Sequence, residues 1–237
     1  MIGETDRVSR YDGLADWYEA AMNSAAERGD LRASSNTLLA ELVGPGSGVA
    51  LDIGCGTGAV SEELRTLGYD PIGIDLSPDQ LRLAANRLPV IQADATYLPI
   101  ASGSIPLVYT TYTSTEYDDL QEVINEIARV LEPGGRYVEI ATHPCFNGGY
   151  AKTLDDGSVV VQPGYRKSHY LEPSHFTSPV RSRVGAWNRP LEDIFNIILK
   201  AGLQIERVAE SGAGKLPDTI GIVALKPHKS AQSRSFN

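Results

Sequence analysis

Apolar residues recur along this chain with two different periods, and each period predicts one type of element. Helical spacing predicts four helices, over 11–22, 31–42, 120–131 and 189–201. In the first of these, Tyr11, Leu14, Trp17 and Tyr18 follow an i, i+3, i+6, i+7 pattern that places them on one face. Ser77, Pro78 and Gln80 carry the signature of a further helix start, with Ser77 as the N-cap.

Short apolar runs between these stripes predict strands. They cover residues 49–53, 71–75, 90–93, 107–110, 137–141, 203–208 and 219–225. Strands that alternate with helices at this spacing predict an α/β fold with a doubly wound, mostly parallel sheet.

The stretch 49–58, Val-Ala-Leu-Asp-Ile-Gly-Cys-Gly-Thr-Gly, joins a buried strand to a glycine-rich turn. Alternating glycines permit a sharp bend and leave no side chain between the backbone and a ligand. The N-terminus of the helix predicted over 59–67 faces the same ligand. Gly54, Gly56 and Ala59 satisfy the G-x-G-x-x-A pattern of dinucleotide-binding proteins, whereas Asp52 would repel a pyrophosphate and favour a cation.

The Asp-x-Gly-x-Gly-x-Gly run at 52–58 resembles motif I of the class I S-adenosylmethionine (SAM) dependent methyltransferases. The segments 130–135 and 187–203 are similar to the small-molecule branch of that class, typified by menaquinone- and ubiquinone-biosynthesis methyltransferases and antibiotic-tailoring enzymes. The resemblance covers about 45–226. It implies a Rossmann-like, seven-stranded sheet whose antiparallel last strand is inserted next to the sixth, with SAM as cofactor and S-adenosylhomocysteine (SAH) as product.

The resemblance also implies which residues contact the cofactor. Asp75, followed by Leu76, is expected to accept the ribose hydroxyls, while Asp94 and the backbone amide of Ala95 meet the adenine ring. The other candidates are the turn residues Gly54, Cys55, Gly56 and Gly58, the threonines Thr110 and Thr111 beside the methionine portion, and the aromatic residues Tyr11 and Tyr18. Because dehydrogenases have no comparable need for Asp94, this residue favours SAM over NAD.

Several of these residues have a structural alternative. Asp52 either helps to hold the positive charge of the cofactor or only orders the glycine turn. Tyr11 and Tyr18 either place aromatic faces near the sulfonium or pack the first helix against the sheet. Asp94 would also serve as a turn former.

The stretch 143–188 is too long for an ordinary connection and is rich in Gly, Pro, Ser and Tyr, which predicts a lid that binds the methyl acceptor. His143 lies just beyond the fifth predicted strand, and Pro144 favours an extended backbone there, so His143 is the first candidate for a general base. His169 and His175 are alternative bases, and Tyr112 is a candidate for orienting the acceptor. Each histidine also fits a structural role in a loop.

Composition narrows the range of partners. The 237-residue chain has a formal net charge of −9, which argues against binding to nucleic acid or a membrane surface. Its two cysteines suggest neither a disulfide framework nor a metal site, and no signal peptide or membrane-spanning run is apparent, so a cytoplasmic protein is expected. The aromatic and locally positive insertion favours an aromatic or anionic small molecule as acceptor. Monomer and homodimer both stay open.

The predicted organisation is a helical cap (1–44), a SAM-binding core (45–142), an insertion (143–188), the C-terminal part of the core (189–226) and a disordered tail (227–237). The expected activity is SAM-dependent methylation of a natural product or quinone-like metabolite at oxygen, with nitrogen and carbon as open alternatives. The competing hypotheses are an NAD-dependent oxidoreductase and a non-catalytic SAM-binding module.

Overall fold

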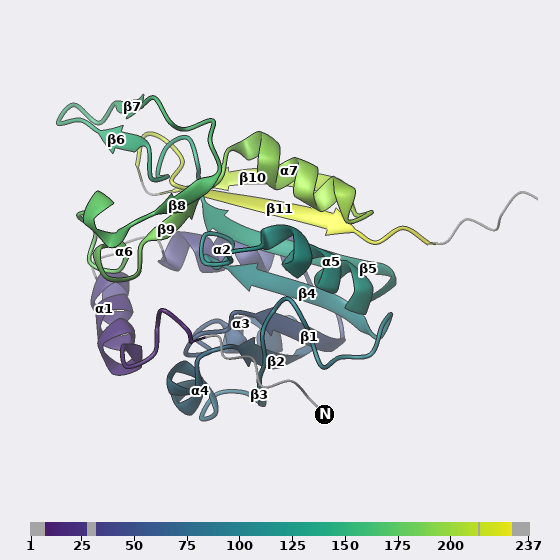
Figure 1. The fold of residues 1–237 in the computed structure, drawn as a ribbon. Coiled ribbons are helices and arrows are strands. Elements are labelled where there is room, and N and C mark those ends of the chain that lie inside the picture. Colours follow the sequence, from purple (N-terminus) through teal and green to yellow (C-terminus); the bar gives the residue numbers. More distant parts are fainter. Residues whose placement is uncertain (1–7, 28–31, 213, 229–237) are drawn as a thin grey trace, which may run out of the picture.

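A seven-stranded sheet forms the centre of the molecule (Figure 1). The structure is a computed structural model that describes residues 8–27, 32–212 and 214–228. The strands are β1 (Gly48–Ile53), β2 (Tyr69–Asp75), β3 (Val90–Gln92), β4 (Ile105–Thr111), β5 (Leu131–Thr142), β10 (Gln204–Ser211) and β11 (Thr219–Leu225). Their order is β10-β11-β5-β4-β1-β2-β3; β11 pairs antiparallel with both β10 and β5, and all the other pairs in this sheet are parallel. The predicted fold is therefore confirmed.

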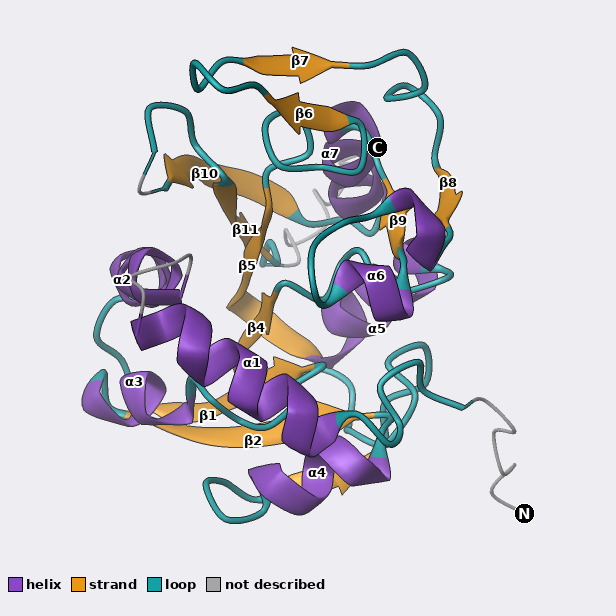
Figure 2. Ribbon diagram, turned by 90° about the vertical axis from the view of Figure 1, so that its left-hand side faces the viewer, coloured by secondary structure: helices purple, strands orange, loops and turns teal. Residues whose placement is uncertain are grey.

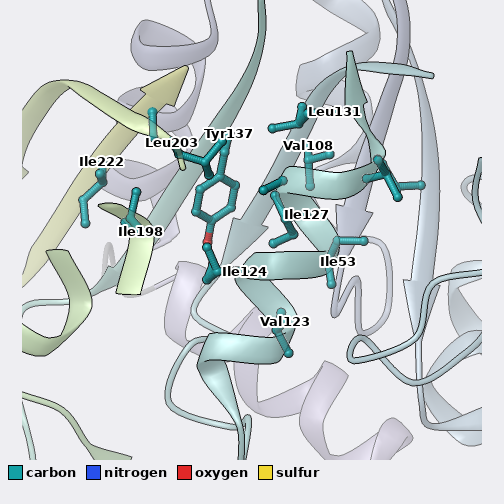
Figure 3. Close-up of a cluster of buried hydrophobic side chains, with 14 of the residues drawn as sticks. Ile53, Val108, Val123, Ile124, Ile127, Leu131, Tyr137, Ile198, Leu203 and Ile222 are labelled. Atoms are coloured by element: carbon teal, nitrogen blue, oxygen red, sulfur yellow. The ribbon is translucent and has the colours of Figure 1, made fainter. Parts of the chain in front are cut away.

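One face of the sheet is covered by α5 (Leu120–Val130) and α7 (Leu191–Lys200). Figure 3 shows Ile124 and Ile127 of α5, and Ile198 of α7, beside the Tyr137 ring of the sheet. The predicted helical spacing puts these side chains on the inner faces of the two helices, where each is almost fully buried. Burial of this kind contributes about 1.5–3 kcal/mol per large apolar side chain.

The opposite face carries α2 (Arg32–Val43), α3 (Ser61–Thr66) and α4 (Pro78–Ala84). Leu38 and Leu42 of α2 pack against β11, where Gly221 allows a close approach, since a Cβ there would lie 2.4 Å from Leu42 Cδ1. Ser77 caps α4 as predicted, because its hydroxyl accepts from the Gln80 amide at 3.3 Å.

The first helix starts later than the apolar spacing predicted. α1 runs over Ala15–Glu27, and Tyr11 lies in the turn before it. The Ala15 amide donates to Asp79 Oδ2 on α4 at 3.0 Å. A side chain remote in sequence thus satisfies the first free amide of the helix, and no local pattern predicts that boundary.

The helix-to-strand junction after α5 also differs from prediction. α5 ends at Val130, and β5 begins at the next residue rather than at Tyr137. The Gly134 amide donates to the Lys226 carbonyl at 2.8 Å, and the Lys226 amide donates to the Gly135 carbonyl at 2.9 Å. Pairing with the end of β11 therefore extends the strand into residues whose local sequence indicates a turn.

The insertion is more regular than its composition suggested. β6 (Ala151–Thr153) pairs with β7 (Val159–Val161), and β8 (His169–Leu171) pairs with β9 (Ala186–Asn188). Between β8 and β9 lie the short helices η1 (Pro173–His175) and α6 (Arg181–Val184). In Figure 1 the insertion and α1 lie at the edge toward which the arrowheads of β4 and β5 point. The predicted tail and the start of the predicted cap lie mostly outside the described residues.

Candidate active site

A cavity of about 1220 Å³ lies at the carboxyl ends of the parallel strands. Its walls come from the glycine turn after β1, the ends of β2 and β4, the segment around Tyr11, and the insertion. Figure 2 views this edge of the molecule, with α1 toward the viewer and the insertion beside it. Open α/β sheets bind ligands at this edge. Pockets for a single small ligand typically measure about 300–1,000 Å³, so the cavity has room for a cofactor and a second molecule.

The glycine turn presents bare backbone to the cavity. Gly54 and Cys55 both donate their amides to the Ile74 carbonyl, at 2.7 and 3.0 Å, which joins the turn to β2. Gly56 has φ 53° and a hypothetical Cβ that meets nothing nearer than Gln80 Oε1 at 3.8 Å, so its α-carbon faces open space. Gly54, Cys55 and Gly56 line the cavity, whereas a Cβ on Gly58 would lie 2.5 Å from Leu88, which gives that glycine a packing role.

Asp75 ends β2 and lines the cavity. Its Oδ2 accepts from the Gly56 amide at 2.8 Å, and its Oδ1 accepts from the Ser77 amide at 2.9 Å. Burial raises the pKa of this carboxyl, and these hydrogen bonds oppose the shift. Each oxygen keeps a second lone pair, so the carboxylate is oriented to accept two further donors such as ribose hydroxyls.

The residues predicted at the adenine end lie together along the same wall. Leu76, Asp94 and Ala95 all line the cavity. Asp94 Oδ1 accepts from both the amide and the hydroxyl of Thr96, at 2.9 and 2.7 Å, which orients the carboxylate through a tight turn. The structure therefore shows Asp94 as a turn former that also lines the cavity, and its contact with adenine stays a prediction.

Asp52 is buried directly behind the glycine turn, without lining the cavity. Burial raises its pKa to about 8; the Tyr109 hydroxyl opposes this shift and Asp75 reinforces it. Tyr109 is the β4 residue paired with Asp52 in register, yet no hydrogen bond of good geometry joins them, and neither Asp52 oxygen has such a partner among the described residues. A positively charged ligand bound nearby would stabilise the ionised form of this buried, unpartnered carboxyl group.

Of the remaining cofactor candidates, the structure brings three to the cavity. Tyr11, Tyr18 and Thr111 line it, and the two tyrosine rings meet edge to face with centroids 5.5 Å apart. Thr110 does not line it, which corrects the prediction for that residue: its buried hydroxyl lies 3.0 Å from the Tyr137 hydroxyl. Successive strand residues point to opposite faces, so only one of two adjacent threonines reaches the site.

His143 lies outside the cavity and is a correction to the prediction of a catalytic base. The buried ring accepts from the Cys145 amide at Nδ1, at 3.2 Å, and its Nε2 lies 2.8 Å from Glu210 Oε1 on β10. Because Nδ1 accepts, Nε2 carries the proton and donates it to Glu210. Both ring nitrogens therefore serve to hold the end of β5 in place.

The two histidines of the insertion differ in position. His169 lines a separate groove with Tyr150, and its nitrogens bond the Lys167 carbonyl and the Tyr150 hydroxyl at 2.9 and 3.0 Å. His175 lines the main cavity, where its Nε2 lies 2.7 Å from the Gly149 carbonyl oxygen. A carbonyl only accepts, so Nε2 carries a proton, and in the neutral form of the ring Nδ1 then holds the lone pair.

Tyr112 also lines the cavity, and its backbone is unusual. Its φ is 59°, which makes it the one described residue other than glycine with a positive φ. Its hydroxyl lies 3.0 Å from Thr219 Oγ1, and burial raises its pKa. Such conformations are uncommon for bulky residues and concentrate at functional sites.

The acidic residues of the loop that follows β4 line the cavity but were not predicted from the sequence as site residues. Glu116 forms an ion pair with Arg181 of α6, and Asp118 forms one with Arg10. Asp118 Oδ1 also accepts from Trp187 Nε1 at 2.9 Å. All five residues line the cavity. The only sequence signal for these ion pairs and this hydrogen bond was the polar run 113–118 directly after a predicted strand.

Comparisons with known proteins agree with this geometry. A family described as "Methyltransferase domain" matches residues 51–138. Demethylmenaquinone methyltransferase of Mycobacterium tuberculosis (strain ATCC 25177 / H37Ra) is 31% identical over 224 residues, which cover 93% of this chain and 90% of that protein. The structure of geranyl diphosphate C-methyltransferase from Streptomyces coelicolor A3(2), in complex with Mg²⁺, geranyl diphosphate and SAH, matches with a TM-score of 0.59 and 16% identity, covering 81% of this chain and 76% of that one.

Other curated relatives are matched over a smaller share of their length. The chain spans 46% of sterol 4-C-methyltransferase strm-1 from Caenorhabditis elegans, with 26% identity over 162 residues (62% of this chain). It spans 43% of malonyl-[acyl-carrier protein] O-methyltransferase from Enterobacter lignolyticus (strain SCF1), with 34% identity over 107 residues (44% of this chain).

The sheet order and the cofactor edge define the class I methyltransferase fold. With 31% identity across nine-tenths of a full-length relative, this chain belongs to the class I SAM-dependent methyltransferase family. SAM is the cofactor of that family, and the carboxylates of Asp75 and Asp94, together with the buried Asp52, fit its ribose, adenine and positive charge.

Two further observations bear on partners. Within residues 8–27, 32–212 and 214–228, no group of three or more His, Cys, Asp or Glu side chains is placed to hold a metal ion. None of the helices in this part of the chain is both long and apolar enough to cross a membrane.

Proposed function

We propose that this protein transfers a methyl group from SAM to the oxygen of a small aromatic or ring-bearing molecule. The observation that carries the proposal is one continuous cavity that joins the glycine turn and Asp75 to the insertion. When bound, SAM supplies a methyl group activated by its sulfonium. The protein contributes alignment, which accounts for a large share of the rate in such transfers.

The acceptor end of the cavity supports a ring-bearing ligand. Phe146, Phe176, Trp187 and Leu171 line it, with the polar Ser114 and Asn147 among them. A mostly apolar wall with a few polar groups is typical of small-molecule sites. The insertion supplies most of this wall, which supports the proposal that it acts as a lid.

His175 is the proposed general base. Its ring is oriented by the Gly149 carbonyl and by edge contacts with Tyr150 and Phe176, at centroid distances of 5.5 and 5.2 Å. This arrangement leaves the Nδ1 lone pair to accept the proton of an acceptor hydroxyl. Tyr112, which follows β4 and lines the same cavity, is proposed to orient the same molecule. The relatives named above include both an O- and a C-methyltransferase, so family membership leaves the acceptor atom to experiment.

Turnover with a panel of phenolic acceptors and methyl-labelled SAM tests the proposal. Replacement of His175 by Ala should lower kcat by about 10²–10⁴-fold and leave SAH affinity unchanged. His169→Ala is the matched control, since its ring lies outside the main cavity, and it should retain wild-type turnover. Full activity of His175→Ala would exclude the base role. SAM binding without methyl transfer to any phenol, amine or activated carbon would instead favour a non-catalytic module.

A further inference from the structure

Tyr112 is held in an uncommon backbone conformation at the edge of the cavity. Its φ of 59° lies in the left-handed region, which bulky side chains rarely adopt. Its amide donates to the Ile140 carbonyl on β5 at 2.7 Å, which fixes this conformation. The residue is half-buried and lines the cavity, so the direction of its hydroxyl proton decides what it offers to a ligand.

Two consecutive hydrogen bonds fix that direction. The Thr219 hydroxyl donates its only proton to Asp218 Oδ1 at 2.8 Å. The Tyr112 hydroxyl lies 3.0 Å from the same Thr219 oxygen. Because the Thr219 proton is already committed to a carboxylate, which only accepts, the hydrogen between Tyr112 and Thr219 comes from Tyr112. Thr219 is 0% exposed, so water does not compete for either bond.

Asp218, the last acceptor in this series, is anchored through its backbone. Its amide donates to the Ser211 carbonyl at 3.1 Å, and its carbonyl accepts from the His143 amide at 2.8 Å. Gly212 leaves space for the carboxylate, since a Cβ there would lie 3.1 Å from Asp218 Oδ1. The loop between β10 and β11 and the end of β5 therefore set the direction of both side-chain hydrogen bonds.

The oxygen of Tyr112 is consequently left as an acceptor of hydrogen bonds. Burial raises the pKa of Tyr112, and hydrogen bonds to Thr219 and to Ser35 of α2 oppose the shift. Since the Tyr112 proton is committed to Thr219, the bond with Ser35 is one that Ser35 donates. Ser35 and Tyr112 both line the cavity, and together they meet it with lone pairs instead of protons.

We propose that Thr219 and Asp218 are positioning residues that fix this corner as an acceptor of hydrogen bonds, so that the site selects methyl acceptors presenting a hydroxyl or amino hydrogen to Tyr112. A group that has lone pairs only, such as an ether oxygen, would leave its hydrogen bonds to water without gaining one here. The inference rests on the proposed function and on the role proposed there for Tyr112.

The charge of the acceptor is a separate property, because residues of both signs line the same cavity. Arg10 pairs with Asp118, and Arg181 pairs with Glu116. Lys215 is exposed on the loop between β10 and β11. These charges stay the same whatever the direction of a hydroxyl proton, so the probes that test the proposal should be neutral and differ in one hydrogen-bond donor.

Three pairs of neutral probes meet this requirement. Catechol, resorcinol and hydroquinone each offer one hydroxyl to the proposed base and a second as the donor, and in their monomethyl ethers that second group only accepts. The ratio of kcat/KM between diol and ether is measured with methyl-labelled SAM. In the wild type, at least one pair should favour the diol by at least about tenfold.

Thr219→Val keeps the shape of the side chain and frees the Tyr112 proton to turn toward an ether. The ratio for the preferred pair should fall at least about fivefold, mainly through a lower KM for the ether. Thr219→Ser retains the hydroxyl and should retain the wild-type ratio. In a Tyr112→Phe background, Thr219→Val should leave the ratio unchanged, because the two residues act through one hydrogen bond.

Thr110→Val is the matched control, because it removes the hydroxyl of another buried threonine, which bonds Tyr137 and does not line the cavity. It should reproduce the wild-type ratio. Should Thr219→Val fail to fold, Tyr112→Phe alone provides the second test, since loss of the phenol oxygen should lower the same ratio at least about fivefold.

Four results would overturn the inference: equal kcat/KM for diol and ether in every wild-type pair, an unchanged ratio in Thr219→Val or Tyr112→Phe, a lowered ratio in Thr219→Ser, or methylation of other phenols but of none of the diols. Failure of the proposed function has a different signature. It would appear in the wild type as loss of SAH binding or as absence of methyl transfer to any acceptor.

Discussion

Asp52 is a buried carboxyl group without a hydrogen-bond partner among the described residues, and its ionisation should give a measurable pH dependence of stability. Its pKa is raised from an ordinary value of 3.8 to about 8. Between these values the unfolded chain has lost the proton while the folded protein retains it. The free energy of unfolding should therefore fall as pH rises from about 4 to about 8, by at most about 1.4 kcal/mol per pH unit from this residue.

Urea denaturation of the wild type and Asp52→Asn at pH values across this range isolates that contribution. Asp75 and Glu139 are present in both proteins, so the difference between the curves reports Asp52 together with its electrostatic coupling to Asp75. The wild type should lose stability relative to Asp52→Asn as pH rises. Parallel curves would mean that the folded protein ionises Asp52 as readily as the unfolded chain does.

At the scale of elements, α7 offers adjacent residues with opposite environments. Ile198 is 1% exposed, whereas its neighbour Leu199 is 52% exposed. Ile198→Ala should lower the free energy of unfolding by about 2–5 kcal/mol, because it removes buried methyl groups and leaves a cavity. Leu199→Ala should change it by no more than about 0.5 kcal/mol, as is usual at exposed positions. Urea denaturation compares the two, and equal losses would contradict the packing of α7 described above.

The insertion is tied to the loop after β4 by Arg181, and that tie should govern how often the insertion opens. Arg181→Gln removes the ion pair with Glu116 and the bond to the Thr115 hydroxyl. Amides of β8 and β9 should then exchange with deuterium faster, because local opening requires fewer contacts to break. Arg166→Gln, at an exposed position of the same insertion, should exchange as the wild type does.

In the wild type, SAH together with a bound acceptor should slow exchange across 143–188, since a lid must open to release its ligands. Equal protection in the free and doubly liganded protein would count against a lid.

For the whole molecule, the cofactor edge predicts selective stabilisation by ligands. SAM and SAH should raise the melting temperature by mass action, by the equivalent of about 2.7 kcal/mol at a hundredfold excess over Kd, and NAD should not. Asp75→Ala should abolish most of the shift, because it removes the carboxylate placed to accept two ribose hydroxyls. Differential scanning fluorimetry makes the comparison. A rise in melting temperature with NAD and none with SAH would contradict the assignment of SAM as the cofactor.

The sequence by itself determined the order and type of the main elements. Apolar period and turn residues report local conformation, so seven strands, the α5 and α7 stripes and the glycine turn could all be predicted from it. The positions of Asp75 and Asp94 at the cavity were predictable for a related reason, while their contacts with the cofactor stay predictions. Each directly follows or ends a predicted strand, and the carboxyl ends of parallel strands meet at one edge.

Only the tertiary structure decided which loop residues share the cavity. His143 carries the stronger local signal, yet Glu210 and the Cys145 amide bind its ring, while His175 lines the cavity. The buried Arg189 donates to the carbonyls of Ser114 and Tyr117, which lie in a loop that no local pattern connects to it. Side-chain direction in loops and the pairing of buried charges are set by long-range packing, because folding alone brings those groups within reach of one another.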